Sequence, residues 1–229
     1  MKHLQRFAGI LTAFCLMIIL FFTSVEAVVY WTPGYFEKEY TKYQVLDDLP
    51  SMTMDDLLDV TDQMMAYLIG KKAELSVITD VDGETQDFFN EQDRFHMGEV
   101  KDLFLGGLKI RNIMLGAVLL ILILLAAQKA ELIKLLPRSY FVTLGITGVI
   151  TVVLGGLFAS DFDKYFRIFH EIFFDNDQWM FDPATDYMIR MLPEGFFYDF
   201  VFRIGGFFVG SLAVLGVVSA VCIFMEKRK

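Results

Sequence analysis

The sequence predicts an all-α membrane protein, a bundle of four transmembrane helices with a small, mainly helical extracytoplasmic domain built from two loops. Hydrophobic residues make up 55% of the 229 residues, and they gather in long runs instead of amphipathic stripes. The acidic residues, which give a formal net charge of -9, lie mostly in two segments between those runs. Because nucleic-acid binding requires a basic surface, this distribution argues against a nucleic-acid partner.

Each apolar run is long enough to cross a bilayer, since about 20 apolar residues span ~30 Å of hydrocarbon. The expected spans are residues 7–27, 108–127, 140–160 and 204–225. An alternative for the first run is a cleaved signal peptide. The run is longer than the apolar region of an ordinary signal peptide, and Val25-Glu26-Ala27 is a poor cleavage site. We therefore expect a retained span.

Basic residues flank the spans on one side and predict the orientation of the chain. They lie before the first span, between the second and third, and after the fourth: Lys2, Arg6, Lys129, Lys134, Arg138, Lys227, Arg228 and Lys229. Because such residues favour the cytoplasmic side, both termini and the connection 128–139 are expected in the cytoplasm. Residues 31–107 and 161–203 then form two extracytoplasmic loops.

The loops carry patterns of local structure. Residues 51–70 have apolar side chains at helical spacing, residues 75–79 suit a short strand, and Asp82-Gly83 suits a turn. The further helices expected are 86–105, running into the second span, 162–173, continuing the third span, and 186–192. Within the fourth span, Gly206-x-x-x-Gly210 predicts close helix packing inside the bundle or, alternatively, a dimer face.

Two histidines stand out in the loops, while Cys15 and Cys222 lie inside spans and are interpreted as small apolar core residues. His96 precedes the second span and His170 follows the third, each by roughly three helical turns, so the two side chains are expected to meet. Glu99, three residues after His96, is expected to accept a ring N–H. Histidine titrates near neutral pH and suits proton transfer. The alternative for either residue is a satisfied core histidine.

The segments around these histidines resemble a bacterial membrane-protein family. Residues 95–101, Phe-His-Met-Gly-Glu-Val-Lys, and residues 169–179, Phe-His-Glu-Ile-Phe-Phe-Asp-Asn-Asp-Gln-Trp, are similar to two signatures of the lipoprotein intramolecular transacylases, called Lit. The resemblance extends to span order, loop lengths and residues 186–197. Glu99 stands where the family more often has aspartate, which keeps the carboxylate. Residues 45–87 match no motif and leave the choice of substrate open.

The resemblance implies an acyl transfer without a cofactor at the outer surface of a bacterial plasma membrane. The sn-2 acyl chain of a diacylglyceryl-modified lipoprotein would move to the α-amino group of its N-terminal cysteine and give the lyso-form. His170 is expected to act as general base and His96 as acid or electrostatic stabiliser, with the reverse assignment open. Side chains expected to bind substrate or to support the histidines, including oxyanion donors, are Glu99, Tyr165, Glu171, Asn176, Asp177 and Trp179.

Two other functions remain open on the residues alone. The acidic loops suit a non-enzymatic membrane protein that binds a partner or a cation, and this hypothesis predicts that each histidine is dispensable. Two imidazoles with nearby carboxylates also suit a metal site, which predicts loss of activity with chelators. His170-Glu171 lacks a second histidine four residues on, however, and so is no zinc-protease motif, and we expect no metal. Membrane lipids are expected around the spans, and the oligomeric state is open.

Overall fold

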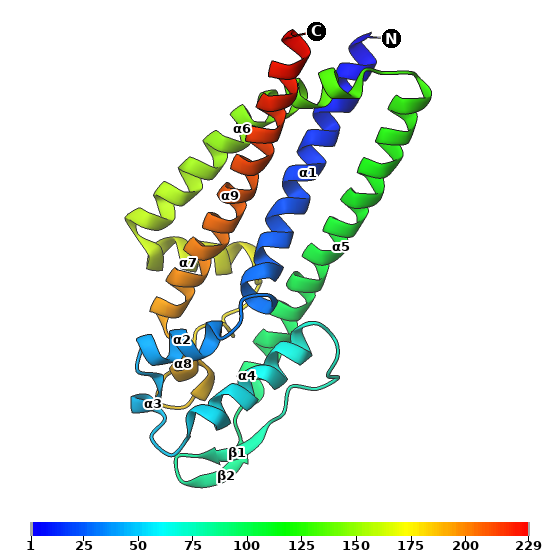
Figure 1. Ribbon diagram of the computed structural model, residues 1–229. Helices are drawn as coiled ribbons and strands as arrows, with labels where there is room; N and C mark the ends of the chain where they lie inside the picture. Colours follow the sequence, from blue (N-terminus) through cyan, green and yellow to red (C-terminus); the bar gives the residue numbers. More distant parts are fainter. Residues whose placement is uncertain (1, 229) are drawn as a thin grey trace. The chain divides into compact units, whose positions relative to one another are not determined.

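A computed structural model describes residues 2–228 (Figure 1), so the basic residue Lys229 and the side chain of Lys2 lie outside the described part. Within it the chain forms two compact units. The membrane unit holds residues 2–31, Leu108–Ser160 and 202–228, and the loop unit holds Thr32–Gly107 and Asp161–Val201. Each unit has its own buried core.

Four helices of the described chain are long and apolar enough to cross a membrane. They are α1 (Lys2–Tyr30), α5 (Glu91–Ala127), α6 (Leu132–Ser160) and α9 (Glu194–Lys227). This confirms the predicted fold class of a helical membrane protein. The helices are longer than the apolar runs, because α5 and α9 each begin with polar and aromatic residues that belong to the loop unit.

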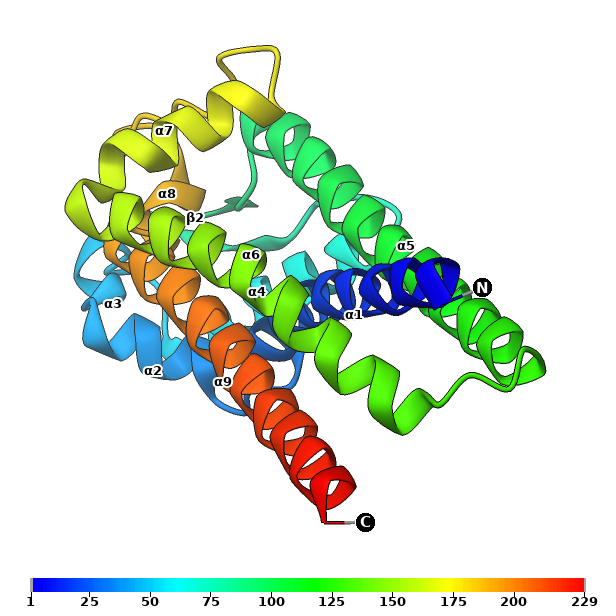
Figure 2. The same ribbon diagram turned by 90° about the horizontal axis from the view of Figure 1, so that it is seen from above.

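Helix α1 is central within the membrane unit, between α5 on one side and α6 and α9 on the other (Figures 1 and 2). Two apolar clusters hold these helices together. One joins α1, α6 and α9, and the other joins α1 and α5; their buried members are Met17, Tyr140, Phe208 and Leu212 in the first and Cys15, Ile19 and Val118 in the second. Cys15 is therefore buried among apolar side chains, as the sequence predicts, whereas Cys222 is only half-buried, contrary to the same prediction.

The glycine pair of α9 does not provide the close helix packing expected within the bundle. A Cβ atom added to Gly206 or Gly210 would meet no atom within 4 Å. Helix α9 instead packs through Phe208 and Leu212, each two residues away and so roughly 200° around the helix from a glycine. The expectation of intramolecular packing through these glycines is wrong, because bulky side chains on another face make the contact.

The loop unit consists of short helices and one hairpin together with the first parts of α5 and α9. The elements are α2 (Tyr35–Lys42), α3 (Val45–Asp48), α4 (Met54–Leu68), β1 (Ile78–Val81), β2 (Glu84–Asp87), α7 (Phe162–Phe173) and α8 (Tyr187–Met191). Helix α4 lies within the predicted range 51–70, and its start is fixed by a capping box between Thr53 and Asp56. The sequence predicts α8 but not α2 or α3.

The strand prediction is correct in kind but shifted along the chain. The expected strand at 75–79 is β1 at Ile78–Val81, which pairs antiparallel with β2. The predicted turn at Asp82-Gly83 is present, with φ of 54° and 81°, the two left-handed residues of a type I′ turn. Because β2 includes residues 86 and 87, the helix expected at 86–105 begins only at Glu91.

Helix α7 does not continue the third membrane helix, contrary to prediction. Helix α6 ends at Ser160, and Asp161 leaves the helical conformation with φ of -162° and ψ of 87°. Its side chain accepts a hydrogen bond from the backbone N–H of Lys164 at 3.2 Å, which caps α7 as a separate helix. The aspartate therefore breaks the apolar helix and starts an amphipathic one.

Candidate active site

The two loop histidines lie next to each other in the loop unit. His96 is in the second turn of α5 and His170 is near the end of α7. Their ring centroids are 5.8 Å apart and the ring planes differ by 30°, so the imidazoles stack. Both side chains are buried, with residue exposures of 5% and 8%. We refer to this pair as the histidine dyad.

Aromatic side chains enclose the dyad. Phe174 contacts both rings, with centroid distances of 4.8 Å to His96 and 5.5 Å to His170. The other members of this aromatic wall are Phe181 beside His96 at 5.4 Å, and Phe166, Phe169 and Trp179 beside His170 at 4.4, 5.5 and 4.9 Å. The wall gives the imidazoles an environment of low polarity.

The backbone of α7 fixes the tautomer of His170. Its Nδ1 atom lies 2.8 Å from the carbonyl oxygen of Phe166, one helical turn earlier. A carbonyl oxygen only accepts hydrogen bonds, so Nδ1 carries the proton and donates it. In the neutral ring the Nε2 atom then has a free lone pair. The local helix geometry thus prepares one nitrogen of His170 to accept a proton.

His96 lacks the hydrogen bond that the sequence predicts. Its Nδ1 atom is 3.9 Å from Oε2 of Glu99, beyond hydrogen-bonding distance. Both atoms are buried and find no hydrogen-bond partner among residues 2–228. The other carboxylate oxygen of Glu99 accepts a hydrogen bond from the side-chain amide of Asn176 at 2.8 Å. Asn176 therefore orients Glu99 beside His96.

Burial shifts the titration of both histidines in the same direction. Burial, and to a smaller extent repulsion between two adjacent imidazolium ions at His96 and His170, together lower the pKa of His96 to about 4. Burial also lowers the pKa of His170, although the hydrogen bond to the Phe166 carbonyl favours the protonated ring and opposes the shift. Both imidazoles are therefore neutral at pH 7.

A polar cavity of about 300 Å³ adjoins the aromatic wall and shares Phe174 and Trp179 with it. Its remaining lining residues are Arg167, Glu171, Asp175, Asn176, Asp177 and Met180. Three of these are exposed carboxylates, so the cavity is suited to a cationic group. Of the residues expected to support the dyad, Glu171, Asn176, Asp177 and Trp179 come together here.

Tyr165 lies elsewhere on α7. It is five residues before His170, which places it roughly 140° around the helix. The ammonium group of Lys164 lies over its ring, 5.4 Å from the centroid. The structure thus separates Tyr165 from the face that carries the histidine.

Sequence reasoning missed two residues near the dyad. Phe181 lies in an irregular segment, where no periodicity points to its role. Asp93, one turn before His96 on α5, has no exposed surface, and one carboxylate oxygen accepts a hydrogen bond from the backbone N–H of Asn90 at 3.0 Å. The pKa of Asp93 is raised to about 7, chiefly by burial and also by the charge of Asp186, against the opposing effects of the Asn90 hydrogen bond and the charge of Arg94. The three-residue spacing between Asp93 and His96 is the feature of the sequence that could have pointed to Asp93.

Within the part of the chain that the structure describes, no three or more histidine, cysteine, aspartate or glutamate side chains are grouped to hold an ion.

Comparisons with known proteins show which fold and which family the chain shares. No curated protein sequence matches the chain. The in meso structure of the membrane integral lipoprotein intramolecular transacylase Lit from Bacillus cereus is similar over 100% of both chains, with a TM-score of 0.81 and 22% identity. A variant of that protein with a histidine replaced by arginine has a TM-score of 0.75 at 22% identity and covers 99% of this chain and 95% of its own.

A second variant, with a histidine replaced by alanine, has a TM-score of 0.74 at 21% identity and covers 100% of this chain and 97% of its own. At such identities these likenesses show a shared fold. The family itself is shown by sequence, because the model of lipoprotein intramolecular transacylase Lit matches residues 10–197. This chain belongs to the Lit family of lipoprotein intramolecular transacylases.

Proposed function

We propose that this transferase moves the sn-2 acyl chain of a diacylglyceryl-modified lipoprotein to the α-amino group of the lipoprotein's N-terminal cysteine, which leaves the lyso-form. The observation that carries the proposal is the stacked pair of neutral imidazoles, His96 and His170, inside an aromatic wall. The new amide bond forms between the amino nitrogen and the acyl carbon, and the sn-2 ester C–O bond breaks. The lipoprotein supplies both reacting groups, so the residues need only position them and move protons.

His170 is the general base of the proposed reaction. An α-ammonium group with a pKa of about 8 gives one proton to water before its nitrogen attacks. As the N–C bond forms, Nε2 of His170 takes a second proton from that nitrogen and returns it to the leaving glycerol oxygen. The hydrogen bond from Nδ1 to Phe166 supports this role, because it leaves Nε2 unprotonated.

His96 is the electrostatic partner in the proposal. A neutral imidazole donates its ring N–H to the oxyanion that develops on the attacked ester carbon. If His96 instead gains a proton during the reaction, Oε2 of Glu99, now 3.9 Å from Nδ1, is placed to stabilise the cation. Asn176 acts as a positioning residue, because its amide donates to Glu99. The indole N–H of Trp179 is a further candidate oxyanion donor.

The polar cavity recruits the substrate's cationic end in this proposal. Glu171, Asp175 and Asp177 line it and attract an α-ammonium group. The neighbouring aromatic wall accepts the ester and excludes water, which would otherwise hydrolyse it. We place this site on the extracytoplasmic face, where the basic flanks of the spans put the loop unit.

The test is an assay of the lipoprotein N-terminus. The full chain is expressed in a bacterium whose lipoproteins carry the diacylglyceryl form, and the N-terminal lipopeptide is read by mass spectrometry. We expect N-acyl, monoacylglyceryl cysteine with the unaltered chain. His170→Gln and His96→Ala should lower its rate of formation by about 10²- to 10⁴-fold, the contribution of a positioned proton-transfer group.

His3→Ala is the matched control, since this third histidine lies outside the loop unit, and it should retain full activity. Unchanged diacylglyceryl cysteine with the unaltered chain confirmed in the membrane would contradict the proposed reaction. Full activity of both dyad variants would instead contradict the assignment of the residues. Loss of activity on addition of a chelator would favour the metal-dependent alternative.

A further inference from the structure

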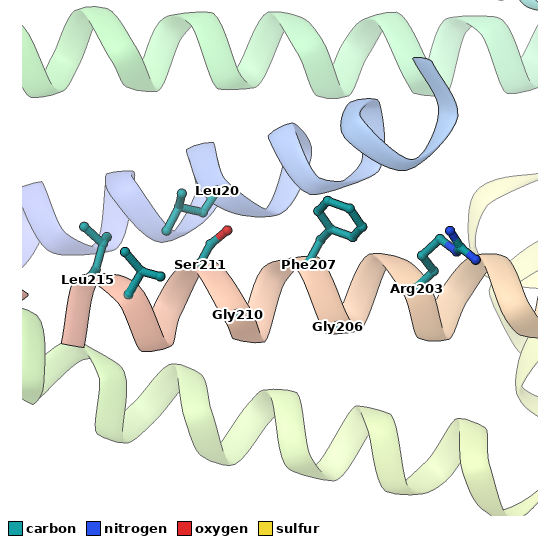
Figure 3. A pocket seen from close by; sticks show the side chains of 8 residues that line it. Leu20, Arg203, Gly206, Phe207, Gly210, Ser211 and Leu215 are labelled. Carbon is teal, nitrogen blue, oxygen red and sulfur yellow. The ribbon is translucent and has the colours of Figure 1, made fainter. Parts of the chain in front are cut away.

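A groove of about 820 Å³ runs between α1 and α9 inside the membrane unit (Figure 3). Its volume falls in the range of about 300–1,000 Å³ typical of small-molecule sites. Leu20 comes from α1, and the other lining residues come from one face of α9, at spacings of three and four: Arg203, Gly206, Phe207, Gly210, Ser211, Val214 and Leu215. Most of this lining is apolar, so the groove suits a hydrocarbon chain.

Two glycines make the hollow of the groove. Gly206 and Gly210 have no atom within 4 Å of where a Cβ would lie, so no side chain of the described residues fills the space above them. Gly205, the neighbour of Gly206, is equally open but does not line the groove. The groove therefore follows from the position of two glycines on one face of α9.

The length of the groove suits an acyl chain that lies parallel to the helices. From Arg203 to Leu215 is twelve residues, which at ~1.5 Å per residue is about 18 Å along α9. This exceeds half of the ~30 Å hydrocarbon thickness, so the groove covers about one leaflet. A lipid whose tail occupies it would place its headgroup at the Arg203 end, where the apolar part of α9 begins.

The charge at that end identifies the headgroup. Arg203 is the one charged residue among those that line the groove. A guanidinium group binds phosphate through parallel N–H donors. The diacylglyceryl cysteine expected as substrate has no phosphate beside its acyl chains, so the charge favours a phospholipid over the substrate.

We propose that the groove binds an anionic phospholipid of the surrounding membrane, with one acyl chain along Gly206 and Gly210 and the phosphate at Arg203. This site is separate from the dyad and does not depend on the transacylase function. A lipid bound there completes the lipid-facing surface between α1 and α9, which the side chains of the described residues leave hollow.

The experiment measures lipid that stays bound to the full chain. The protein is placed in nanodiscs of equal phosphatidylglycerol and phosphatidylcholine, released into mild detergent, and weighed by native mass spectrometry. We expect retained phosphatidylglycerol on the unaltered protein. Gly206→Leu and Gly210→Leu fill the groove and should lose it, while the matched variant Gly205→Leu should keep it.

A second variant tests the headgroup without filling the groove. Arg203→Gln should retain lipid but lower the preference for phosphatidylglycerol about fivefold, the contribution of one basic residue at an anionic surface. Lys109→Gln, an exposed cation on α5 outside the groove, should leave that preference unchanged.

Two outcomes would overturn the proposal. The first is equal lipid retention by Gly210→Leu and Gly205→Leu, which would mean that only loosely associated lipid is measured. The second is a dimer that dissociates in Gly206→Leu and Gly210→Leu with no change in retained lipid. In that case the occupant of the groove is a second copy of the chain.

Discussion

The two imidazoles of the dyad differ in the atoms that lie nearest to their Nδ1 atoms. In His170 this atom donates to the carbonyl of its own helix, whereas in His96 it faces a carboxylate oxygen 3.9 Å away. The same aromatic wall lowers the pKa of both side chains, but only His170 has its tautomer fixed. This difference is the physical basis for assigning the base to His170.

The acid side of the activity profile tests this environment. Because burial lowers the pKa of His170, its imidazole stays neutral below the ordinary value of about 6.5. Activity should first fall below pH ~8, where the substrate's α-ammonium group keeps its proton, and the second, steeper acid limb, which belongs to His170, should begin only below pH 6.5. Trp179→Ala removes a ring 4.9 Å from His170 and admits water, so its acid limb should move up toward pH 6.5. The measurement is the pH dependence of transacylation.

Trp31→Ala serves as the control, since Trp31 is the other tryptophan of the chain and is 59% exposed. Its profile should match that of the unaltered protein. If the acid limb of Trp179→Ala lies at the same pH as that of the unaltered protein, the aromatic wall does not lower the pKa of His170.

Sequence alone points to His96, His170 and Glu99, although on the same helices it misses Asp93 and wrongly includes Tyr165. His96 and His170 follow from their similar offsets from two membrane spans, and Glu99 follows from its spacing to His96. The contact between Asn176 and Glu99 joins two segments far apart in the chain, and no periodicity predicts it. Phe181 is likewise fixed by tertiary packing in an irregular segment.

At the scale of elements, the end of α2 packs against the start of α9. The hydroxyl of Tyr43, which follows α2, donates a hydrogen bond to Asp199 at 2.7 Å, and Lys42 pairs with the same carboxylate. The ring of Tyr43 lies over Gly195, so close that an added Cβ would sit 2.7 Å from Cζ of the ring. A glycine in the first turn of α9 is what permits this contact.

Gly195→Ala should therefore destabilise the protein even though alanine favours helices. The clash with Tyr43 should cost about 1–3 kcal/mol, as overpacking does, and each kcal/mol should lower the unfolding temperature by about 2–4 °C. The control Gly106→Ala, where an added Cβ meets no atom within 4 Å, should not be destabilised. Thermal unfolding in detergent measures both, and equal stability of the two variants would contradict the predicted clash.

Elements are predictable where one local signal dominates. Long apolar runs, the helical spacing of apolar residues at 51–70 and the Asp82-Gly83 turn all lead to correct elements. The strand is misplaced because Leu75 and Val77 are apolar and buried, yet they precede the paired residues. Helix α2 is missed because its buried Tyr35 and Tyr40 alternate with charged residues over only eight positions.

At the scale of the whole molecule, the orientation in the membrane stays a prediction. With Cys15 and Cys222 replaced by alanine, Thr85→Cys in β2 and Lys134→Cys near the start of α6 each present one thiol. We expect a membrane-impermeant maleimide added to intact cells to label the first and not the second, because basic residues hold the 128–139 connection in the cytoplasm. Labelling of both variants after cell lysis serves as the control for thiol reactivity. Labelling of Lys134→Cys alone in intact cells would indicate the opposite orientation.

The hydrogen bond between His170 and Phe166 has a consequence for how the enzyme returns to its starting state. With Nδ1 engaged by the helix backbone, the ring exchanges protons through Nε2 alone. In the proposed reaction the same atom removes a proton from the attacking nitrogen and delivers it to the departing oxygen. The residue thus ends each turnover in the tautomer in which it began, and no ring flip or chain of water molecules is required between one lipoprotein and the next.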